Sequence, residues 1–522
     1  VKFLRAHFYY KLITVFRKVP WIDEEVFKNN TQEKTPNDAL TYQQLYEKII
    51  ADFKTAYDVL PETQSERARA HKIAAASYLA KCYLDLAWGD GYEQTTGVSH
   101  INPTDMQKVI DYTDAVVGSN YGYLEDYGDI FLPEHKNSKE SIFAVQCSDY
   151  KDDNTTFGRA NWSNTLNGCW GIWSCGWDFH KPSQNLVDAF KTKNGLPEFD
   201  DFDQTQAHPV NGHPTTQKWD PRLFHTVGMP TFPYKYEDQY TLTKKNSRNP
   251  NDYGYYTSLK EVPQRSKGET YNSPWQAFAM NEYVFRYTDV MLMRAEALIE
   301  LGRLSEARTI INAIRQRAAN SINKHIAYAA NQCEIALYPS SYFADKETAR
   351  KCLRWERRLE MGMEHERFFD LRRWGIASGG MMAGTVFKEI AEKVYSNQIR
   401  YDLSSMKPEA GRTLMPPVKN GESRSAQAVV KWFDIRTTPK RVDADFSAYW
   451  RNATRDTLNV RKLTVREGMM PYVIGMGARD AVYALERCGL RVNLAGHGRV
   501  ILQSVPSGQA VTRGQTIDII LN

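Results

Sequence analysis

The stretch that decides the fold lies past the middle of the chain and reads Arg286-Tyr287-Thr288-Asp289-Val290-Met291-Leu292-Met293-Arg294-Ala295-Glu296-Ala297-Leu298-Ile299-Glu300. Its apolar residues recur every three to four positions, which is the period of an α-helix, and Gly302 ends it. A partner helix is predicted over Leu304–Ala318. Its inward residues are Ala307, Ile310, Ile311 and Ile314. The two helices together resemble one tetratricopeptide unit.

More helices of the same size are predicted on either side of this pair. They cover residues 1–18, Tyr42–Leu60, Ala68–Trp88, Asp105–Val117 and Lys346–Met363. The first is recognised from apolar residues at helical spacing, namely Phe3, Leu4, Phe8, Leu12 and Val15. The second has one apolar stripe, formed by Leu45, Ile49, Phe53 and Ala56. Helix pairs of this kind resemble tetratricopeptide packing, so we expect a mainly α-helical body.

Residues 120–280 have a different character, because Gly, Pro, Asn, Asp and aromatic residues dominate and helical periodicity is poor. One short strand is predicted over Ile142–Val145, and the rest is expected to form long structured loops, which are usually functional. Aromatic residues are enriched in these loops. The candidate ligand-binding residues are Trp170, Trp173, Trp177, Tyr255 and Trp275.

Aromatic rings in polar loops suit the binding of sugars. A sugar ring presents flat C–H faces that stack on aromatic faces, while neighbouring Asn, Asp and Arg side chains bind hydroxyl groups. The alternative for any single Trp is that it fills a crevice in the loop layer.

Composition and charge exclude several classes of protein. The chain has 522 residues, of which 42% are apolar, 25% charged and 12% aromatic, as in a folded globular protein. No run of about 18 apolar residues occurs. Residues 379–522 contain 21 Lys and Arg against 13 Asp and Glu, whereas residues 1–378 have a small acidic excess. This difference predicts two modules, but clustered basic runs typical of nucleic-acid binding are absent.

Motifs of catalysis, cofactors and metals are missing or incomplete. The sequence lacks glycine-rich phosphate loops, a His-Glu-x-x-His motif and any Cys-x-x-Cys pair. Glu364, His365 and Glu366 are adjacent, so their side chains should diverge and not form one site. Ser404-x-x-Lys407 matches a transpeptidase motif, but no Lys-Thr-Gly segment accompanies it. We therefore predict no catalytic residues, cofactor or metal. Cys169 and Cys175 could form a disulfide or remain free thiols.

The helical part resembles the SusD/RagB family of outer-membrane nutrient-binding lipoproteins over about residues 1–377. The segments that carry this resemblance are Phe3–Tyr10 with Val19-Pro20, Lys72–Leu84, Glu140–Gln146, Leu186–Phe190 with Asn194-Gly195, Asp220–Leu223, Arg286–Ala297, and Glu356–Glu360 through Phe368–Gly375. The resemblance implies a tetratricopeptide scaffold with a variable loop layer and no catalysis. It implies capture of glycan or peptide at the cell surface beside a SusC-like TonB-dependent transporter, with the membrane reached only through a lipid anchor. The family's signal peptide, anchor cysteine and first helices have no counterpart in this sequence.

The C-terminal part resembles two other families. Residues 379–395 resemble the last helix of a class B penicillin-binding protein transpeptidase, with a short helix expected over Val386–Tyr395, and residues 400–460 are expected to be a polar linker. Residues 461–522 resemble a PASTA domain, a small α+β module. Its predicted elements are the helix Ala478–Cys488 and strands over Leu490–Leu494, Arg499–Ser504 and Thr516–Leu521. The sequence thus predicts a chimera joined near Ser378–Gly384.

The leading hypothesis is a non-catalytic, surface-exposed oligosaccharide-binding component of an outer-membrane uptake system. One alternative is a peptidoglycan-associated fragment of a cell-division transpeptidase that acts through its PASTA domain. The other is a helical-repeat scaffold for protein interactions. The predicted domains are 1–377, 378–460 and 461–522.

Overall fold

The computed structural model describes residues 1–29, 34–89, 100–148, 167–172, 177–209, 216–267, 270–271, 277–376, 419–432, 435–440, 442–451 and 457–522. The chain divides into two compact units, residues 1–390 and 391–522. Among the described residues, we find no helix whose length and apolar character would allow it to cross a membrane.

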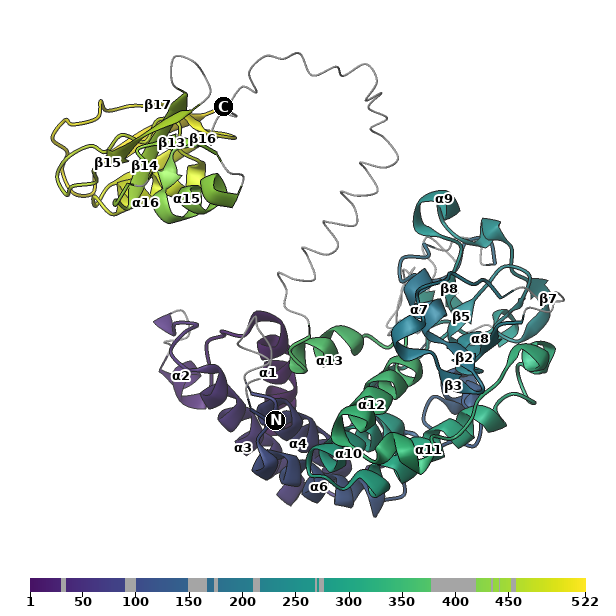
Figure 1. Ribbon diagram of the computed structural model, residues 1–522. Coiled ribbons are helices and arrows are strands. Elements are labelled where there is room, and N and C mark those ends of the chain that lie inside the picture. The colour runs from purple at the N-terminus through teal and green to yellow at the C-terminus, as the bar shows by residue number, and fades with distance from the viewer. Residues whose placement is uncertain are drawn as a thin grey trace, which may run out of the picture. The chain divides into compact units, whose positions relative to one another are not determined.

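The first unit is built on a helical body (Figure 1). Its longer helices are α1 (Lys2–Phe16), α3 (Tyr42–Val59), α4 (Lys72–Ala87), α6 (Pro103–Val117), α10 (Tyr287–Glu300), α11 (Leu304–Asn320) and α12 (Lys346–Glu360). Shorter helices are α2 (Glu24–Lys28), α7 (Gln184–Ala189), α8 (Arg222–Thr226), α9 (Pro250–Tyr253) and α13 (Arg367–Arg373). Every helix predicted within the described residues of this unit is confirmed. Helix α10 packs on α4, α6, α11 and α12, so the stretch that decides the fold lies at the centre of the body.

Helix α1 differs from expectation in the face that it buries. Phe3 is buried, but three further members of the apolar pattern, Leu4, Phe8 and Val15, have 51%, 61% and 60% of their surface exposed. The buried face instead carries Ala6, Tyr10 and Ile13. Because α1 is apolar around most of its circumference, spacing alone identifies the helix but not its inward side.

A loop-rich layer occupies one side of α11 and α12 (Figure 1). Most of its strands have only two or three residues. They are β2 (Lys191–Lys193), β3 (Leu196–Pro197), β4 (Lys218–Trp219), β5 (Val227–Gly228), β6 (Pro233–Tyr234), β7 (Glu237–Thr241), β8 (Thr257–Ser258), β9 (Thr270–Tyr271) and β10 (Ala277–Phe278). The predicted central strand is confirmed as β1 (Ser141–Val145), which pairs antiparallel with β11 (Glu282–Arg286) directly before α10. The layer has its own core around Phe190, Trp219 and Phe224.

A buried network of charged side chains joins the layer to the body. Glu360, at the end of α12, lies 2.8 Å from Arg286 and 3.1 Å from Arg222, and it also pairs with Arg317. All four side chains are almost fully buried. Burial by itself would raise the pKa of Glu360, but the charges of Arg317, Arg286 and Arg222 lower it far below the usual range. The carboxylate therefore stays ionised and organises the surrounding arginines.

The second unit contains two small modules that share one helix followed by three strands, and the first module has an additional strand before its helix. The first has β12 (Gly421–Glu422), α15 (Ser423–Trp432), β13 (Thr437–Thr438), β14 (Phe446–Arg451) and β15 (Leu458–Leu463). The second has α16 (Ala478–Glu486), β16 (Arg491–Gly496), β17 (Val500–Gln503) and β18 (Thr516–Leu521). In both, the last strand pairs parallel with the strand after the helix and antiparallel with the middle strand.

The helix and three strands of the second module are those predicted from the sequence of residues 461–522. The linker expectation is wrong over the described part of residues 419–460, where the first module lies. Apolar and polar residues alternate at the start of Phe446–Arg451, as in a strand, but this stretch is short and the segments around it are rich in charged residues. Phe446, Ala448 and Leu463 pack with Leu485 and Ile517 of the second module in one core. The predicted helix Val386–Tyr395 lies outside the described residues.

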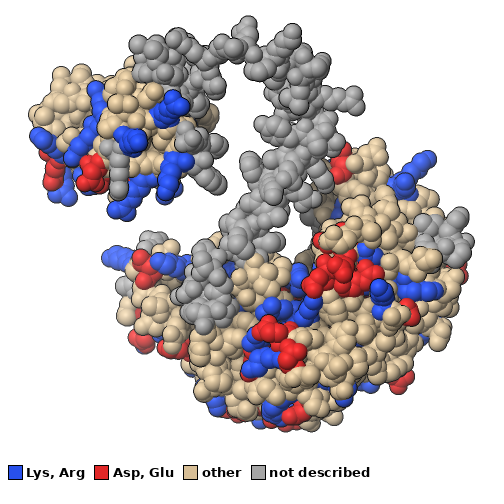
Figure 2. All heavy atoms as spheres, viewed as in Figure 1, with Lys and Arg blue, Asp and Glu red and all other residues tan. Residues whose placement is uncertain are grey.

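Surface charge follows the split seen in the sequence. On the face shown in Figure 2, acidic and basic side chains lie side by side on the first unit, whereas Lys and Arg outnumber Asp and Glu on the second unit.

Candidate ligand-binding site

Exposed aromatic rings gather along one segment of the loop layer, residues 244–256. The backbone of Trp170 pairs with this segment, since its N–H donates to the Asn246 carbonyl at 3.0 Å and its carbonyl accepts from Asn246 Nδ2 at 2.9 Å. Phe179 lies beneath the Arg248 guanidinium, and Tyr253 and Tyr255 belong to the segment itself. We call Trp170, Phe179, Tyr253 and Tyr255 the aromatic cluster.

The loops that carry this cluster are tied together by buried polar contacts. Lys181 Nζ donates to Asp178 at 2.5 Å, to the Tyr256 carbonyl at 2.9 Å, and to the Ser247 hydroxyl. Asp178 also accepts from the Arg248 N–H at 3.1 Å. These contacts connect residues 177–181 with residues 247–256. They therefore hold together the two loops that carry Phe179, Tyr253 and Tyr255.

Exposure and charge make the cluster suitable for a polar ligand with flat apolar faces. Trp170, Phe179 and Tyr253 have 48%, 60% and 64% of their surface exposed. The Lys244 ammonium lies 5.1 Å from the centre of the Tyr255 ring, and the Arg248 guanidinium lies 5.1 Å from that of Phe179. Both are cation–π contacts that hold donors beside the rings.

A tyrosine pair adds hydroxyl groups at the edge of the cluster. The Tyr255 and Tyr256 hydroxyls lie 3.1 Å and 2.6 Å from His208 Nδ1, and the Tyr256 hydroxyl also donates to Gln184 at 2.9 Å. Burial raises the pKa of both tyrosines. Their hydroxyls are therefore protonated at neutral pH, and that of half-buried Tyr255 can exchange hydrogen bonds with a ligand.

The structure brings together three of the five residues predicted as ligand-binding. Trp170 and Tyr255 belong to the aromatic cluster, and Trp177 lies half-buried beside it, 5.4 Å from the Arg248 guanidinium. Trp173 and Trp275 lie outside the described residues. A role in ligand binding remains a prediction for all five.

Sequence reasoning missed Phe179, Lys244 and Arg248. The last two belong to the run Lys244-Lys245-Asn246-Ser247-Arg248, which directly precedes the tyrosines and could have indicated a basic edge. Phe179 carries no such signal, because only the fold places it beneath Arg248.

The cysteines show no disulfide among the described residues. Cys169 is a buried free thiol, and its possible partner Cys175 lies outside the described residues.

Comparison with models of known protein families shows which family the chain belongs to. The model of the SusD family matches residues 139–456. The chain belongs to the SusD family. Members of this family are binding proteins without catalytic activity. A second model, described as starch-binding associating with outer membrane, matches residues 2–84, and a PASTA domain model matches residues 468–522.

Individual relatives are distant. SusD-like protein P2 of Formosa agariphila is 25% identical over 71% of this chain and 63% of its own length. A SusD-like protein of Bacteroides ovatus is 23% identical over 72% of this chain and 58% of its own length. This SusD-family chain thus spans about three fifths of the length of those relatives. The crystal structure of a SusD-like protein from Bacteroides fragilis has a TM-score of 0.51 at 23% identity, covers 72% of this chain and 68% of its own, and shows the shared fold.

The match to the SusD family extends beyond the boundary expected from sequence. It runs to residue 456, past residue 377, although residues 421–451 pack within the second unit of the structure. The resemblance of residues 379–395 to a penicillin-binding protein remains a prediction.

Proposed function

We propose that this SusD-family protein binds an oligosaccharide at the aromatic cluster. The observation that carries the proposal is the arrangement of exposed rings from separate loops around residues 244–256, with Lys244, Asn246 and Arg248 between them. Rings stack on the C–H faces of sugars, and the side-chain donors bind their hydroxyls. Membership of a family of binding proteins supports the same conclusion, as does the description of the model matched by residues 2–84.

We further propose that the protein works at the cell surface as the glycan-capturing component of an outer-membrane uptake system. Family membership supports a SusC-like TonB-dependent transporter as its partner and a lipid anchor as its attachment to the membrane. The PASTA domain at residues 468–522 is an additional module of this protein.

Replacing Trp170 by Ala is expected to weaken oligosaccharide binding about tenfold. The ring is 48% exposed, and loss of one aromatic stacking contact costs roughly 1–2 kcal/mol in a binding site. The measurement is isothermal titration of the purified chain with an oligosaccharide selected from a panel of neutral plant, algal and host glycans.

The matched control is Trp450→Ala. Trp450 is 47% exposed and lies on β14 in the second unit, so its loss removes a similarly exposed ring that is not a member of the aromatic cluster. Equal affinities of the two variants and the unaltered protein would contradict the assignment of Trp170 to the binding site.

A further inference from the structure

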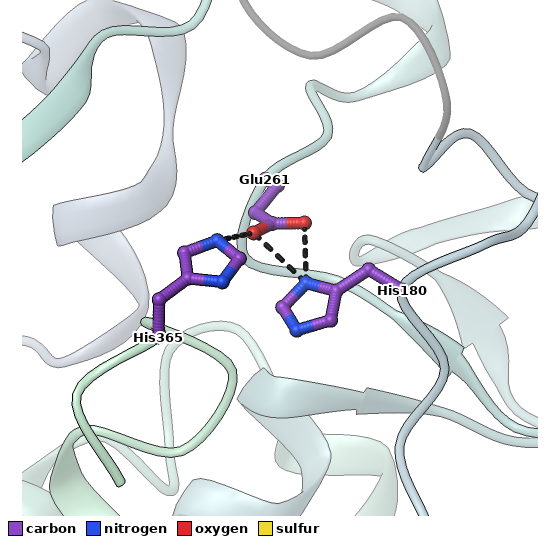
Figure 3. Close-up of side chains that lie close together, drawn as sticks. All are labelled: His180, Glu261 and His365. Atoms are coloured by element: carbon purple, nitrogen blue, oxygen red, sulfur yellow. Dashed lines mark hydrogen bonds and ion pairs between the residues drawn. The ribbon is translucent and has the colours of Figure 1, made fainter. Parts of the chain in front are cut away.

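Three potential metal ligands converge where the loop layer meets the helical body. His180 precedes α7, Glu261 follows β8, and His365 lies in the turn between α12 and α13. Figure 3 shows that each imidazole turns a nitrogen toward the Glu261 carboxylate. His180 Nδ1 lies 2.9 and 3.0 Å from the two carboxylate oxygens, and His365 Nε2 lies 2.8 Å from one of them. We call these three residues the His–Glu cluster.

We propose that the His–Glu cluster binds a divalent transition-metal ion of the Zn²⁺ class. Imidazole nitrogens and a carboxylate oxygen are ligands that Zn²⁺ prefers, and the three potential ligand atoms all lie within 4.8 Å of one another. Ligand atoms around a tetrahedral Zn²⁺ are about 3.3 Å apart, given bond lengths of about 2.0–2.1 Å. The observed nitrogen–oxygen distances would therefore need to widen by only about half an ångström.

The turn that presents His365 has an unusual backbone. His365 has a φ of +66° and Met363 a φ of +65°, both in the left-handed region that residues other than glycine rarely adopt. Such conformations cost roughly 1–3 kcal/mol each and persist where surrounding contacts enforce them. The result here is a partly exposed imidazole stacked on His180, with ring centres 4.5 Å apart.

The residues on either side of His365 are held by ion pairs of their own and do not contact its imidazole. Glu364 accepts from Arg286 Nε at 2.7 Å and from Lys260 Nζ at 2.6 Å. Glu366 pairs with Lys81 at 2.7 Å. The three adjacent side chains thus diverge, as their spacing predicts, and His365 finds its partners in other segments of the chain.

Glu261 is positioned as a metal ligand should be. The buried Asn167 side chain donates to its carboxylate, which is the kind of outer contact that orients metal ligands. The same carboxylate faces a nitrogen of each imidazole, so the three potential ligands already point toward one place.

A small pocket beside the cluster provides room for water on the ion. It has a volume of about 70 Å³, and its lining includes Glu261, Asn281, Glu282 and His365. A cavity of this size has room for several waters. An ion bound by three protein ligands could complete its coordination there.

The test is binding of Zn²⁺ itself by the purified 522-residue chain, measured by titration against a chromophoric chelator after treatment with EDTA. We expect one tight site that is weakened roughly 100-fold or more in His180→Ala and in His365→Asn, and about 10–100-fold in Asn167→Ala. Asn tolerates the left-handed backbone, so His365→Asn preserves the turn.

Two control variants locate the site. His497→Ala removes an exposed imidazole of the second unit. His325→Ala alters a second group of potential ligands found among the described residues, namely Asp126, Asp129 and His325. In that group the Lys324 ammonium already lies 2.6 Å from the Asp129 carboxylate. Both should retain the tight site.

X-ray absorption of the Zn²⁺-loaded, unaltered protein checks the ligands without any substitution. Two imidazoles with oxygen ligands are expected. A spectrum with sulfur ligands, or uptake of Zn²⁺ that His180→Ala and His365→Asn leave unchanged, would overturn the proposal, as would the absence of a tight site. The last result would mean that the His–Glu cluster is an ion-pair group held by protons alone.

Discussion

Glu360→Gln is expected to lower the free energy of unfolding of the first unit by about 3–5 kcal/mol. The substitution keeps the size of the side chain but removes the charge that three buried arginines share, Arg222, Arg286 and Arg317. Breaking a buried ion pair from one side leaves uncompensated charge in a low-dielectric interior, which is far more costly than losing a surface pair. Urea unfolding followed by tryptophan fluorescence measures the effect, since ten of the twelve tryptophans precede residue 391.

Glu347→Gln is the matched control. Glu347 lies on the same helix and pairs with Arg350, but its side chain is 82% exposed. We expect a change within about 0.5 kcal/mol for this variant. If the two variants lost the same small amount of stability, the buried network would not be a major contributor to the fold.

Trp219→Ala is expected to cost about 3–5 kcal/mol and to weaken oligosaccharide binding as well. Trp219 is fully buried in the core of the loop layer, where Tyr256 is also buried and Tyr255 packs against it. Its carbonyl accepts from the Glu334 N–H at 2.9 Å, which ties the layer to the segment after α11. A cavity here would loosen the support beneath the aromatic cluster.

Trp219→Phe is the conservative variant at the same position. It keeps most of the volume of the side chain, so it should lose less than half as much stability as Trp219→Ala. Thermal unfolding of both variants, with titration of the selected oligosaccharide below the transition, gives the two readouts. Full affinity in a destabilised Trp219→Ala protein would show that the core does not position the cluster.

The helical body could be predicted from the sequence because local signals agree with the tertiary structure. In α3, the stripe Leu45, Ile49, Phe53 and Ala56 is the face that becomes buried, and Thr41 caps the helix through its hydroxyl. Helix α1 lacks such contrast between its faces, so its inward side depends on the neighbours it meets. The short strands of the loop layer have too few residues to show the alternation that identifies a strand. In the second unit, the two-residue strand β13 is just as short, and it pairs with β15 about twenty residues later in the chain.

The candidate site could be predicted only in part. Trp170 and Tyr255 were indicated by residue type and by their polar surroundings. Phe179 and the His–Glu cluster depend on contacts between segments about 70–185 residues apart, which no local pattern reveals. The divergence of Glu364, His365 and Glu366 was predictable, but the partner that each would meet was not.

Binding of oligosaccharide at the aromatic cluster can be measured by titrating the panel of neutral glycans into the unaltered chain and into the double variant Trp170→Ala/Tyr255→Ala. Trp450→Ala is the control for loss of an exposed ring. We expect saturable binding of at least one oligosaccharide to the unaltered chain and to the control, and its loss in the double variant. Binding that the double variant retains in full, or no binding across the panel, would contradict this expectation.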